Sequence, residues 1–261
     1  MTDRDLRRTF DEAPELYQSA RPGYPAALLA DLADLAGVRP GVRLLEIGPG
    51  TGQVTLDLVR LGAQVTAVEL GPGLAEILRQ RLAGSAMVVV SAFEDWPLPA
   101  EPFDAVVAFT AWHWLDPAVR ASRVAAALRG SGALATVTTS HVLGGTEPFF
   151  VDVQTCYERW DPATPPGLRL EPADAVPAAL DEVDTDPRFL PAVRRRYQQE
   201  ISYTTAQYLD LLATYSGHRA LPPDHLRGLT SDIAALIDKK YQGRIAKRYL
   251  HELRVAVKGR R

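Results

Sequence analysis

The sequence is poor in cysteine and in long apolar runs, and each shortage excludes a class of protein. Its single cysteine, Cys156, rules out an internal disulfide and fits a reducing compartment, so we expect a cytoplasmic protein. No apolar run approaches the roughly 20 residues that cross a bilayer. The charged start MTDRDLRRTFDEAPELY also lacks the apolar centre of a secretory signal. We therefore predict no membrane partner.

Metal-ligand spacing and a basic surface pattern are absent as well. With one cysteine and no His-x₃-His pair, the sequence predicts no metal site. The net charge is −3, and basic residues gather only near the end of the chain, in KKYQGRIAKR and KGRR. Such a distribution is typical of a solvated face and tail, not of a nucleic-acid footprint. A small-molecule partner is predicted, with the protein a monomer or homodimer.

Residues 25–139 alternate between helical and strand-like patterns. From Pro25 to Gly37 the leucines share one helical face, with the proline and glycine where helices begin and end. The strand-like runs are apolar throughout, which is typical of a parallel sheet covered on both faces. The expected strands are 42–48, 63–70, 86–93, 103–111 and 132–139, and the expected helices are 25–36, 52–62, 73–84 and 117–130.

After residue 140 the chain becomes rich in proline and glycine. We predict helices at about 149–160, 174–183, 205–216 and 226–241, and strands at 195–204 and 246–258. The resulting fold class is α/β: a doubly wound, Rossmann-like, mostly parallel seven-stranded sheet with an antiparallel last strand and an inserted helical cap. Three regions are expected, an N-terminal helical segment (1–36), a core (37–140) and a helical cap with the closing strands (141–261).

Three glycines follow the first predicted strand in the stretch LLEIGPGTGQVT. Gly48, Gly50 and Gly52 allow positive φ and the close approach of a ligand to bare backbone. Glu46, just before them, suits a ligand with a cationic group better than a pyrophosphate. Gln53 stands where a dinucleotide fold has its last glycine, so an NAD-dependent oxidoreductase is disfavoured. A purely structural glycine turn remains an alternative.

Glu69 ends the second predicted strand at the same edge of the sheet. An acid at this position accepts hydrogen bonds from a ribose diol in nucleotide-binding folds, or alternatively caps the next helix. The third and fourth predicted strands run into SAFEDWPLP and FTAWHWLDP. Aromatic and acidic residues from several strand ends are therefore expected along one crevice.

These stretches closely resemble class I S-adenosylmethionine-dependent methyltransferases. The resemblance is carried by EIGPGTG (46–52), Glu69, FEDWP (93–97) and FD (103–104). YQSARPGYP and AWHWLDP are similar to bacterial members that act on small molecules, and AWHWLDP resembles the trans-aconitate-methyltransferase-like group. The resemblance covers about residues 10–140 and continues weakly through 197–204 and 245–257.

The resemblance implies S-adenosyl-L-methionine as the cofactor. The glycine loop would pass beneath its amino-acid and ribose parts, Glu46 would orient the loop or reach the ammonium group through water, and Glu69 would bind both ribose hydroxyls. Ala92 stands where many relatives have an aspartate for the adenine amino group, which leaves Glu94 for that contact. The implied cofactor-binding residues are Tyr17, Arg21, Glu46, Gly48, Gly50, Gly52, Glu69, Leu70, Ala92, Phe93, Glu94 and Thr110.

The resemblance also implies that residues 1–36 close over the cofactor-binding core at 37–140. Arg21 would pair with the cofactor's carboxylate, and a surface ion pair is the alternative. Tyr17 is assigned to the same segment, with plain packing as its alternative.

Methyl transfer from this cofactor mainly requires that the protein align an acceptor with the methyl group and exclude water. His113 is predicted at a strand end beside that methyl group, and its ordinary pKa of about 6.5 makes it the candidate catalytic base. Hydrogen bonding to the acceptor or backbone is its alternative role. Trp112, His141 and Tyr208 are the candidate acceptor-binding residues, although cap aromatics such as Tyr208 also suit a core.

The sequence thus predicts a cytoplasmic, metal-independent methyltransferase that methylates a carboxylate or hydroxyl oxygen of a small molecule. An S-adenosylmethionine-binding protein without methyl transfer, such as a cyclase helper or regulatory partner, is the alternative. A nucleic-acid methyltransferase is disfavoured, because TAWH occupies the place of the Asn/Asp-Pro-Pro-Tyr motif.

Overall fold

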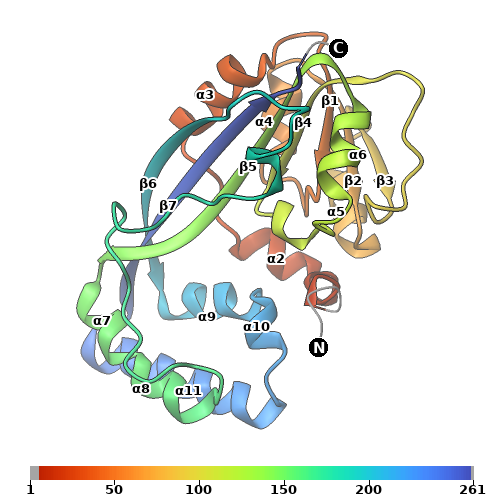
Figure 1. The fold of residues 1–261 in the computed structure, drawn as a ribbon. Coiled ribbons are helices and arrows are strands. Elements are labelled where there is room, and N and C mark those ends of the chain that lie inside the picture. Colours follow the sequence, from red (N-terminus) through yellow and green to blue (C-terminus); the bar gives the residue numbers. More distant parts are fainter. Residues whose placement is uncertain (1–5, 260–261) are drawn as a thin grey trace. The chain divides into compact units, whose positions relative to one another are not determined.

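The computed structural model describes residues 6–259 and forms a seven-stranded sheet of order β3-β2-β1-β4-β5-β7-β6 (Figure 1). β1 pairs in parallel with β2 and β4, as do β2 with β3 and β4 with β5, and the last strand is antiparallel. The predicted fold class is confirmed. The strands are β1 (Arg43–Ile47), β2 (Gln64–Glu69), β3 (Met87–Val90), β4 (Phe103–Phe109), β5 (Leu128–Gly145), β6 (Val193–Thr204) and β7 (Arg244–Val257).

Helices follow most of the strands. They are α2 (Pro14–Ala20), α3 (Ala26–Ala36), α4 (Thr55–Arg60), α5 (Pro72–Leu82), α6 (Arg120–Ala127), α7 (Glu147–Asp152), α8 (Gln154–Trp160), α9 (Thr205–Ala213), α10 (Ser216–Arg219) and α11 (Pro223–Lys240), with 3₁₀ turns η1 (Thr9–Glu12), η2 (Trp112–Trp114) and η3 (Glu182–Asp184). α3 follows Pro25 and ends at Gly37, whose φ of 67° is the left-handed value that favours glycine. No helix among the described residues is long and apolar enough to cross a membrane.

The chain divides into two compact units. We call Pro22–Thr139, Ala178–Tyr197 and His251–Arg261 the core unit, and Met1–Arg21, Ser140–Pro177 and Gln198–Leu250 the cap unit. The chain passes from one unit to the other inside β5, β6 and β7. Residues 1–5, which belong to the predicted N-terminal segment, and residues 260–261 lie outside the described part of the chain.

The core unit buries apolar side chains on both faces of its sheet. One cluster joins Leu32 of α3, Leu58 of α4 and Leu78 of α5 to inward-facing residues of β1, β2, β4 and β5. The other joins Val124 of α6 and Phe189 to the opposite faces of the same strands. Covered on both sides, the strands are apolar throughout, and polar groups gather at the strand ends.

The cap unit has its own apolar cluster. Phe149 of α7, Leu211 of α9 and Ile233 of α11 are each fully buried there, together with aromatic residues of β6 and β7.

Two predictions beyond residue 140 are wrong. The predicted helix at 174–183 is absent, and only the short turn η3 lies at its end. Pro177 lacks the N–H that a helix interior needs, and Asp181 caps η3 by accepting a hydrogen bond from the Val183 N–H at 2.9 Å. The strand predicted to end at 139 continues in the structure, as part of β5, as far as Gly145.

Candidate functional site

The carboxyl ends of β1, β2, β3 and β4 meet at one edge of the core unit. Glu46 of β1 pairs in register with Ala67 of β2 and Val107 of β4, and Glu69 pairs with Val90 of β3. The strand order reverses between β1 and β4, which is where open α/β sheets bind ligands. The sequence-predicted residues of the core unit lie along this edge.

The glycine loop after β1 needs glycine for its conformation and its packing. Gly48, Gly50 and Gly52 have φ values of 64°, 60° and 91°, all in the left-handed region. A Cβ on Gly48 would lie 2.6 Å from the Cβ of Ala111, and one on Gly52 would lie 2.6 Å from Leu78 Cδ1. At these two positions, protein atoms alone already require glycine.

Glu69 ties two loops together. Its Oε2 accepts a hydrogen bond from the Gly50 N–H at 2.9 Å, and its Oε1 accepts one from the Gly71 N–H at 2.8 Å. Gly71 is the residue that precedes α5, so the alternative capping role is seen in this structure. A carboxylate oxygen has two lone pairs, so each oxygen can still accept from a ribose hydroxyl.

Glu46 is a carboxylate buried inside the sheet. It is 1% exposed, and its Oε2 has no hydrogen-bond partner among the described residues. Burial raises the pKa of Glu46 from 4.5 to about 7; the Thr55 hydroxyl lowers it, and the nearby charge of Glu69 raises it. A positive charge on a bound ligand would stabilise the ionised form of this group.

At the carboxyl end of β3 lie the buried ring of Phe93 and the carboxylate of Glu94, which is hydrogen-bonded to the segment before α6. Phe93 is 2% exposed and packs in the core beneath Arg123, whose Cζ lies 5.4 Å from the ring centroid. Glu94 Oε1 accepts a hydrogen bond from the Asp116 N–H at 3.1 Å. Ala92 and Leu70 are half-buried at the same edge.

The fourth strand end contains strained backbone. Thr110 has a φ of 51°, which is rare for a β-branched residue, and its N–H donates to the Val137 carbonyl at 2.8 Å. Its Oγ1 lies 3.4 Å from the Tyr24 hydroxyl. Such strain persists where surrounding contacts fix the backbone, and it is concentrated at functional sites.

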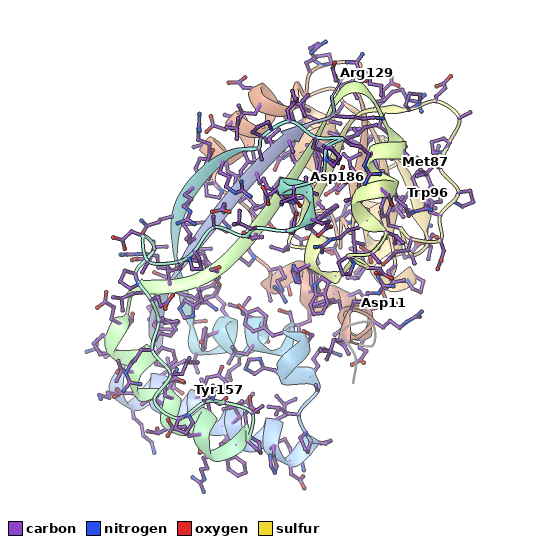
Figure 2. All side chains as sticks on the ribbon, viewed as in Figure 1. Asp11, Met87, Trp96, Arg129, Tyr157 and Asp186 are labelled. Carbon is purple, nitrogen blue, oxygen red and sulfur yellow. The ribbon has the colours of Figure 1, made fainter. Side chains whose placement is uncertain are left out.

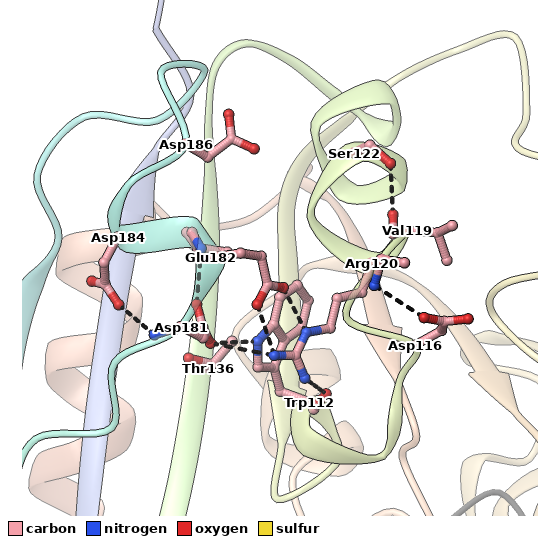
Figure 3. A network of polar contacts seen from close by, with 12 residues as sticks. Trp112, Asp116, Val119, Arg120, Ser122, Thr136, Asp181, Glu182, Asp184 and Asp186 are labelled. Carbon is pink, nitrogen blue, oxygen red and sulfur yellow. Dashed lines mark hydrogen bonds and ion pairs between the residues drawn. The ribbon is translucent and has the colours of Figure 1, made fainter.

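Trp112 is held inside a network of ion pairs (Figure 3). It is 4% exposed, its Nε1–H donates to Asp181 Oδ2 at 2.7 Å, and its carbonyl accepts from Arg120 Nη1 at 2.7 Å. Arg254 Nη1 donates to Asp181 Oδ1 at 2.6 Å, and Arg120 forms a bidentate pair with Glu182. A pocket beside this network is lined in part by the Trp112 ring.

His113 and Trp114 lie on the same short turn, η2. His113 is exposed, and its ring centroid is 4.8 Å from that of half-buried Trp114. The buried member of the Trp-His-Trp stretch is therefore Trp112, and the exposed imidazole stands next to a strand end of the predicted site.

Four predicted site residues belong to the cap unit. Arg21 Nη2 donates to the Thr214 carbonyl at 2.9 Å, and its Cζ lies 5.1 Å from the Tyr17 ring centroid. His141 lies on β5 with its ring centroid 4.4 Å from that of Phe150. Tyr208 is 3% exposed and packs in the cap cluster.

Sequence reasoning missed the residues that fix Trp112. Asp181, Arg120 and Arg254 come from a loop, a helix and a strand far apart in the chain, and buried arginines do not stand out in a sequence. The sequence contains one indication of this network, the acidic run DEVD (181–184) at the end of a stretch predicted as helix.

The residues at the strand ends fit S-adenosylmethionine. The partnerless oxygen of Glu46 suits its positive charge, and Glu69 can accept from its ribose hydroxyls. Among residues 6–259 no group of three or more His, Cys, Asp or Glu side chains is arranged to hold a metal ion.

Comparison with known proteins finds similarity to methyltransferases. Residues 45–136 match the family model described as a methyltransferase domain. The chain is 37% identical over 134 residues to an uncharacterized methyltransferase of Mycobacterium tuberculosis, an alignment that covers 51% of this chain and 53% of that protein. The chain thus spans about half the length of this curated relative.

Two solved structures share the fold over the whole chain. The (4+2)-cyclase SpnF is 19% identical with a TM-score of 0.57, and the match covers 100% of this chain and 98% of that one. Phosphoethanolamine N-methyltransferase 2 of Haemonchus contortus, in complex with phosphomonomethylethanolamine and S-adenosylhomocysteine, is 16% identical with a TM-score of 0.56. That match covers 100% of this chain and 61% of that one. At these identities the likeness describes the fold alone.

Proposed function

We propose that this chain, whose residues 45–136 match a methyltransferase domain, is a class I S-adenosylmethionine-dependent methyltransferase that methylates an oxygen of a small molecule. The cofactor is S-adenosyl-L-methionine, held at the ends of β1, β2 and β3. The acceptor oxygen belongs to a carboxylate or a hydroxyl group. The lone cysteine, Cys156, is buried and free, and such sparse use of cysteine supports a cytoplasmic setting.

One observation carries the proposal: the buried carboxylate of Glu46, which has an oxygen without a partner, directly precedes the left-handed glycine loop. A buried carboxylate is stable in its charged form only when a positive group or hydrogen bonds compensate it. A dinucleotide pyrophosphate would add negative charge at this place. A ligand with a sulfonium and an ammonium group supplies the missing positive charge.

The bound cofactor supplies an electrophilic methyl group, so the chain's own residues bind, orient and exclude water. Glu46 would face the positive end of the ligand. Glu69, which holds Gly50 in place, would accept from the ribose hydroxyls. A hydroxyl acceptor must lose a proton, and His113, whose imidazole is exposed, is the residue proposed to accept it. A carboxylate acceptor needs no such transfer.

The choice of an oxygen acceptor rests on the sequence. YQSARPGYP is similar to bacterial small-molecule members and AWHWLDP to the trans-aconitate-methyltransferase-like group, and the sequence gathers basic residues only near its end. Tyr17 and Arg21 are proposed to border the cofactor from the N-terminal segment, and Trp112, His141 and Tyr208 to contact the acceptor.

The test is binding followed by turnover. Titration calorimetry should show binding of S-adenosylmethionine and S-adenosylhomocysteine but not NADH. Incubation with small acids and phenols should then release S-adenosylhomocysteine with at least one acceptor. Absence of binding at millimolar cofactor would overturn the proposal.

The alternative is a protein that binds the cofactor without transferring its methyl group. The full-length likeness to SpnF shows that a cyclase shares this fold. Cofactor binding without S-adenosylhomocysteine release, across acids, phenols and amines, would favour this alternative.

A further inference from the structure

A small pocket lies within the core unit, over the neighbouring strands β5 and β7. Its walls include Thr136 and Thr138 of β5, Glu252 and Arg254 of β7, and Trp112. Because residues two apart share one face of a strand, each strand contributes two polar side chains to the pocket. The cavity of about 20 Å³ has room for one water-sized group. All the residues that line it belong to the core unit.

The pocket adjoins the strand end at which the acceptor is proposed to react. Thr136 pairs in register with Ala108 of β4, two residues before Thr110. Trp112 follows Thr110 on the turn η2 and directly precedes His113. An acceptor bound at this strand end therefore has the pocket beside it in the same unit.

The charges around the pocket are balanced, and part of their network is drawn in Figure 3. Arg254 Nη1 donates to Asp181 and Asp184 at 2.6 and 3.2 Å. Asp186, labelled in Figure 2, pairs instead with Arg188, two residues further along the chain. Among residues 6–259 the network joins carboxylates and arginines in equal number: Asp181, Glu182, Asp184 and Glu252 with Arg120, Arg194, Arg196 and Arg254. A charged ligand would therefore add an uncompensated charge.

One hydrogen-bond donor of this network lacks an acceptor. Arg254 is 4% exposed, and its Nε donates to Thr136 Oγ1 at 3.1 Å. Its Nη2, on the same edge of the guanidinium as Nε, is buried and has no hydrogen-bond partner within the described part of the chain. A buried donor without an acceptor is costly, and more so when the donor is charged. The pocket is therefore suited to a ligand atom that accepts a hydrogen bond.

The pocket also contains acceptors, which narrows the class of ligand. The Thr138 hydroxyl lines it, and Glu252 Oε1, which accepts from the Ala179 N–H at 3.1 Å, has a second lone pair. A hydroxyl group can accept from Arg254 and donate to one of these oxygens at the same time. A carbonyl oxygen can only accept, and a carboxylate would bring negative charge beside Glu252. An uncharged hydroxyl group satisfies the pocket best.

We propose that this pocket binds a hydroxyl group of the acceptor, and that this hydroxyl is not the oxygen that receives the methyl. The inference rests on the proposed function, because it narrows the class of acceptor. An oxygen that accepts a hydrogen bond from an arginine is a weaker nucleophile, so the pocket positions the acceptor and does not activate it. The acceptor is then a hydroxylated molecule: a hydroxy acid, a diol, or a phenol with a second oxygen group.

Three probes of similar size test the chemistry of the pocket. Crystals of the protein with S-adenosylhomocysteine are soaked in propan-2-ol, acetone or acetate, which present a hydroxyl, a carbonyl or a carboxylate. Propan-2-ol should place its oxygen in the pocket against Arg254 Nη2, and the other two probes should not. An ordered water that persists in every soak would overturn the inference, as would acetone or acetate in the pocket at equal or higher occupancy.

Two alanine substitutions test the pocket in solution. Ala179→Leu fills its mouth, because Ala179 is exposed and lines the pocket. Ala178→Leu is the matched control, because Ala178 is also exposed but does not line the pocket. Each variant and the wild-type protein are saturated with S-adenosylhomocysteine and titrated with 3-hydroxybenzoate and with benzoate, which differ only in the hydroxyl group. A second pair, 3-hydroxybutanoate and butanoate, repeats the comparison on an aliphatic skeleton.

The hydroxylated member of at least one pair should bind wild type and Ala178→Leu about tenfold more tightly than its partner, as expected for one hydrogen bond to a charged group. This advantage should disappear in Ala179→Leu. Equal affinities within both pairs for the wild-type protein would overturn the inference, and so would an advantage that persists in Ala179→Leu. Circular dichroism confirms that each variant is folded.

Binding of S-adenosylmethionine tests the proposed function separately. It should be unchanged in Ala179→Leu, because Ala179 is not among the residues assigned to the cofactor. Cofactor binding without any preference for a hydroxyl group would refute this inference and leave the proposed function standing, whereas failure of the wild-type protein to bind the cofactor would refute both.

Discussion

Glu46→Gln should change how the stability of the protein depends on pH. The carboxylate is buried, and its pKa is raised from 4.5 to about 7, mainly because burial disfavours the charged form. At about 1.4 kcal/mol for each unit of pKa, this displacement corresponds to about 3 kcal/mol of unfolding free energy.

The sign follows from proton binding. Between pH 4.5 and about 7 the folded state holds a proton on Glu46 that the unfolded chain has released, so the wild-type protein loses stability as the pH rises through this window. The glutamine variant has no titrating group at position 46. The stability of the variant relative to wild type should therefore increase by about 3 kcal/mol from about pH 4 to about pH 8. Any cost of the buried amide is the same at every pH and does not change this slope.

Urea denaturation at several pH values measures the difference. The control is Glu76→Gln, an exposed glutamate of α5 that lies 3.6 Å from Arg79 and should show almost no pH-dependent difference. Cofactor affinity gives a second measurement, because a cationic ligand should bind wild type more tightly as Glu46 ionises and should lose this pH dependence in Glu46→Gln. If the two proteins keep a constant stability difference across this range, the carboxylate is not perturbed and the charge argument is refuted.

Four further substitutions test the rest of the site. Glu69→Ala removes the acceptor of the Gly50 and Gly71 N–H groups and of the proposed ribose hydroxyls. Cofactor binding should weaken by about 1.5–3 kcal/mol for each ribose hydrogen bond lost to the carboxylate, and unchanged affinity by calorimetry would exclude the ribose role. Gly50→Val imposes a side chain at a φ of 60° and should abolish binding, whereas wild-type affinity would mean that the loop is only a turn. His113→Ala should reduce turnover with a hydroxyl acceptor far more than cofactor affinity, and equal turnover removes the proposal of a base. Asp181→Ala removes the acceptor of Trp112 Nε1 and one of the two carboxylates that pair with Arg254, which keeps Asp184 and Thr136. It should lower the unfolding free energy by about 1–3 kcal/mol in urea denaturation, and no measurable loss would show that the network contributes little.

Local sequence patterns were sufficient for the sheet and for the first elements of the site. The end of α3 at Gly37, the glycine loop after β1 and the acid at the end of β2 each depend on residues within a few positions of one another. Alternating apolar strands and helices then place the strand ends at one edge, because parallel strands point the same way. For this reason the sequence alone predicts that Glu46, Glu69 and Thr110 lie at one edge, where these strands end in the structure.

Residues 174–184 show where local patterns fail to predict secondary structure. The alanines of this segment favour a helix, but Pro177 interrupts it. Asp181 instead accepts hydrogen bonds from Trp112 and Arg254, which are distant in the chain. This long-range network also buries Trp112 and leaves Trp114 half-buried, although the two residues look alike in sequence.

The sequence by itself determined the α/β fold and the backbone turn at the first strand end, because glycine conformation and apolar spacing act locally. Only the tertiary structure decided which charges are left unbalanced. The partnerless oxygen of Glu46 results from burial and from neighbours distant in the chain. Electrostatic energies depend on distance in space and on exclusion of water, and a sequence records neither.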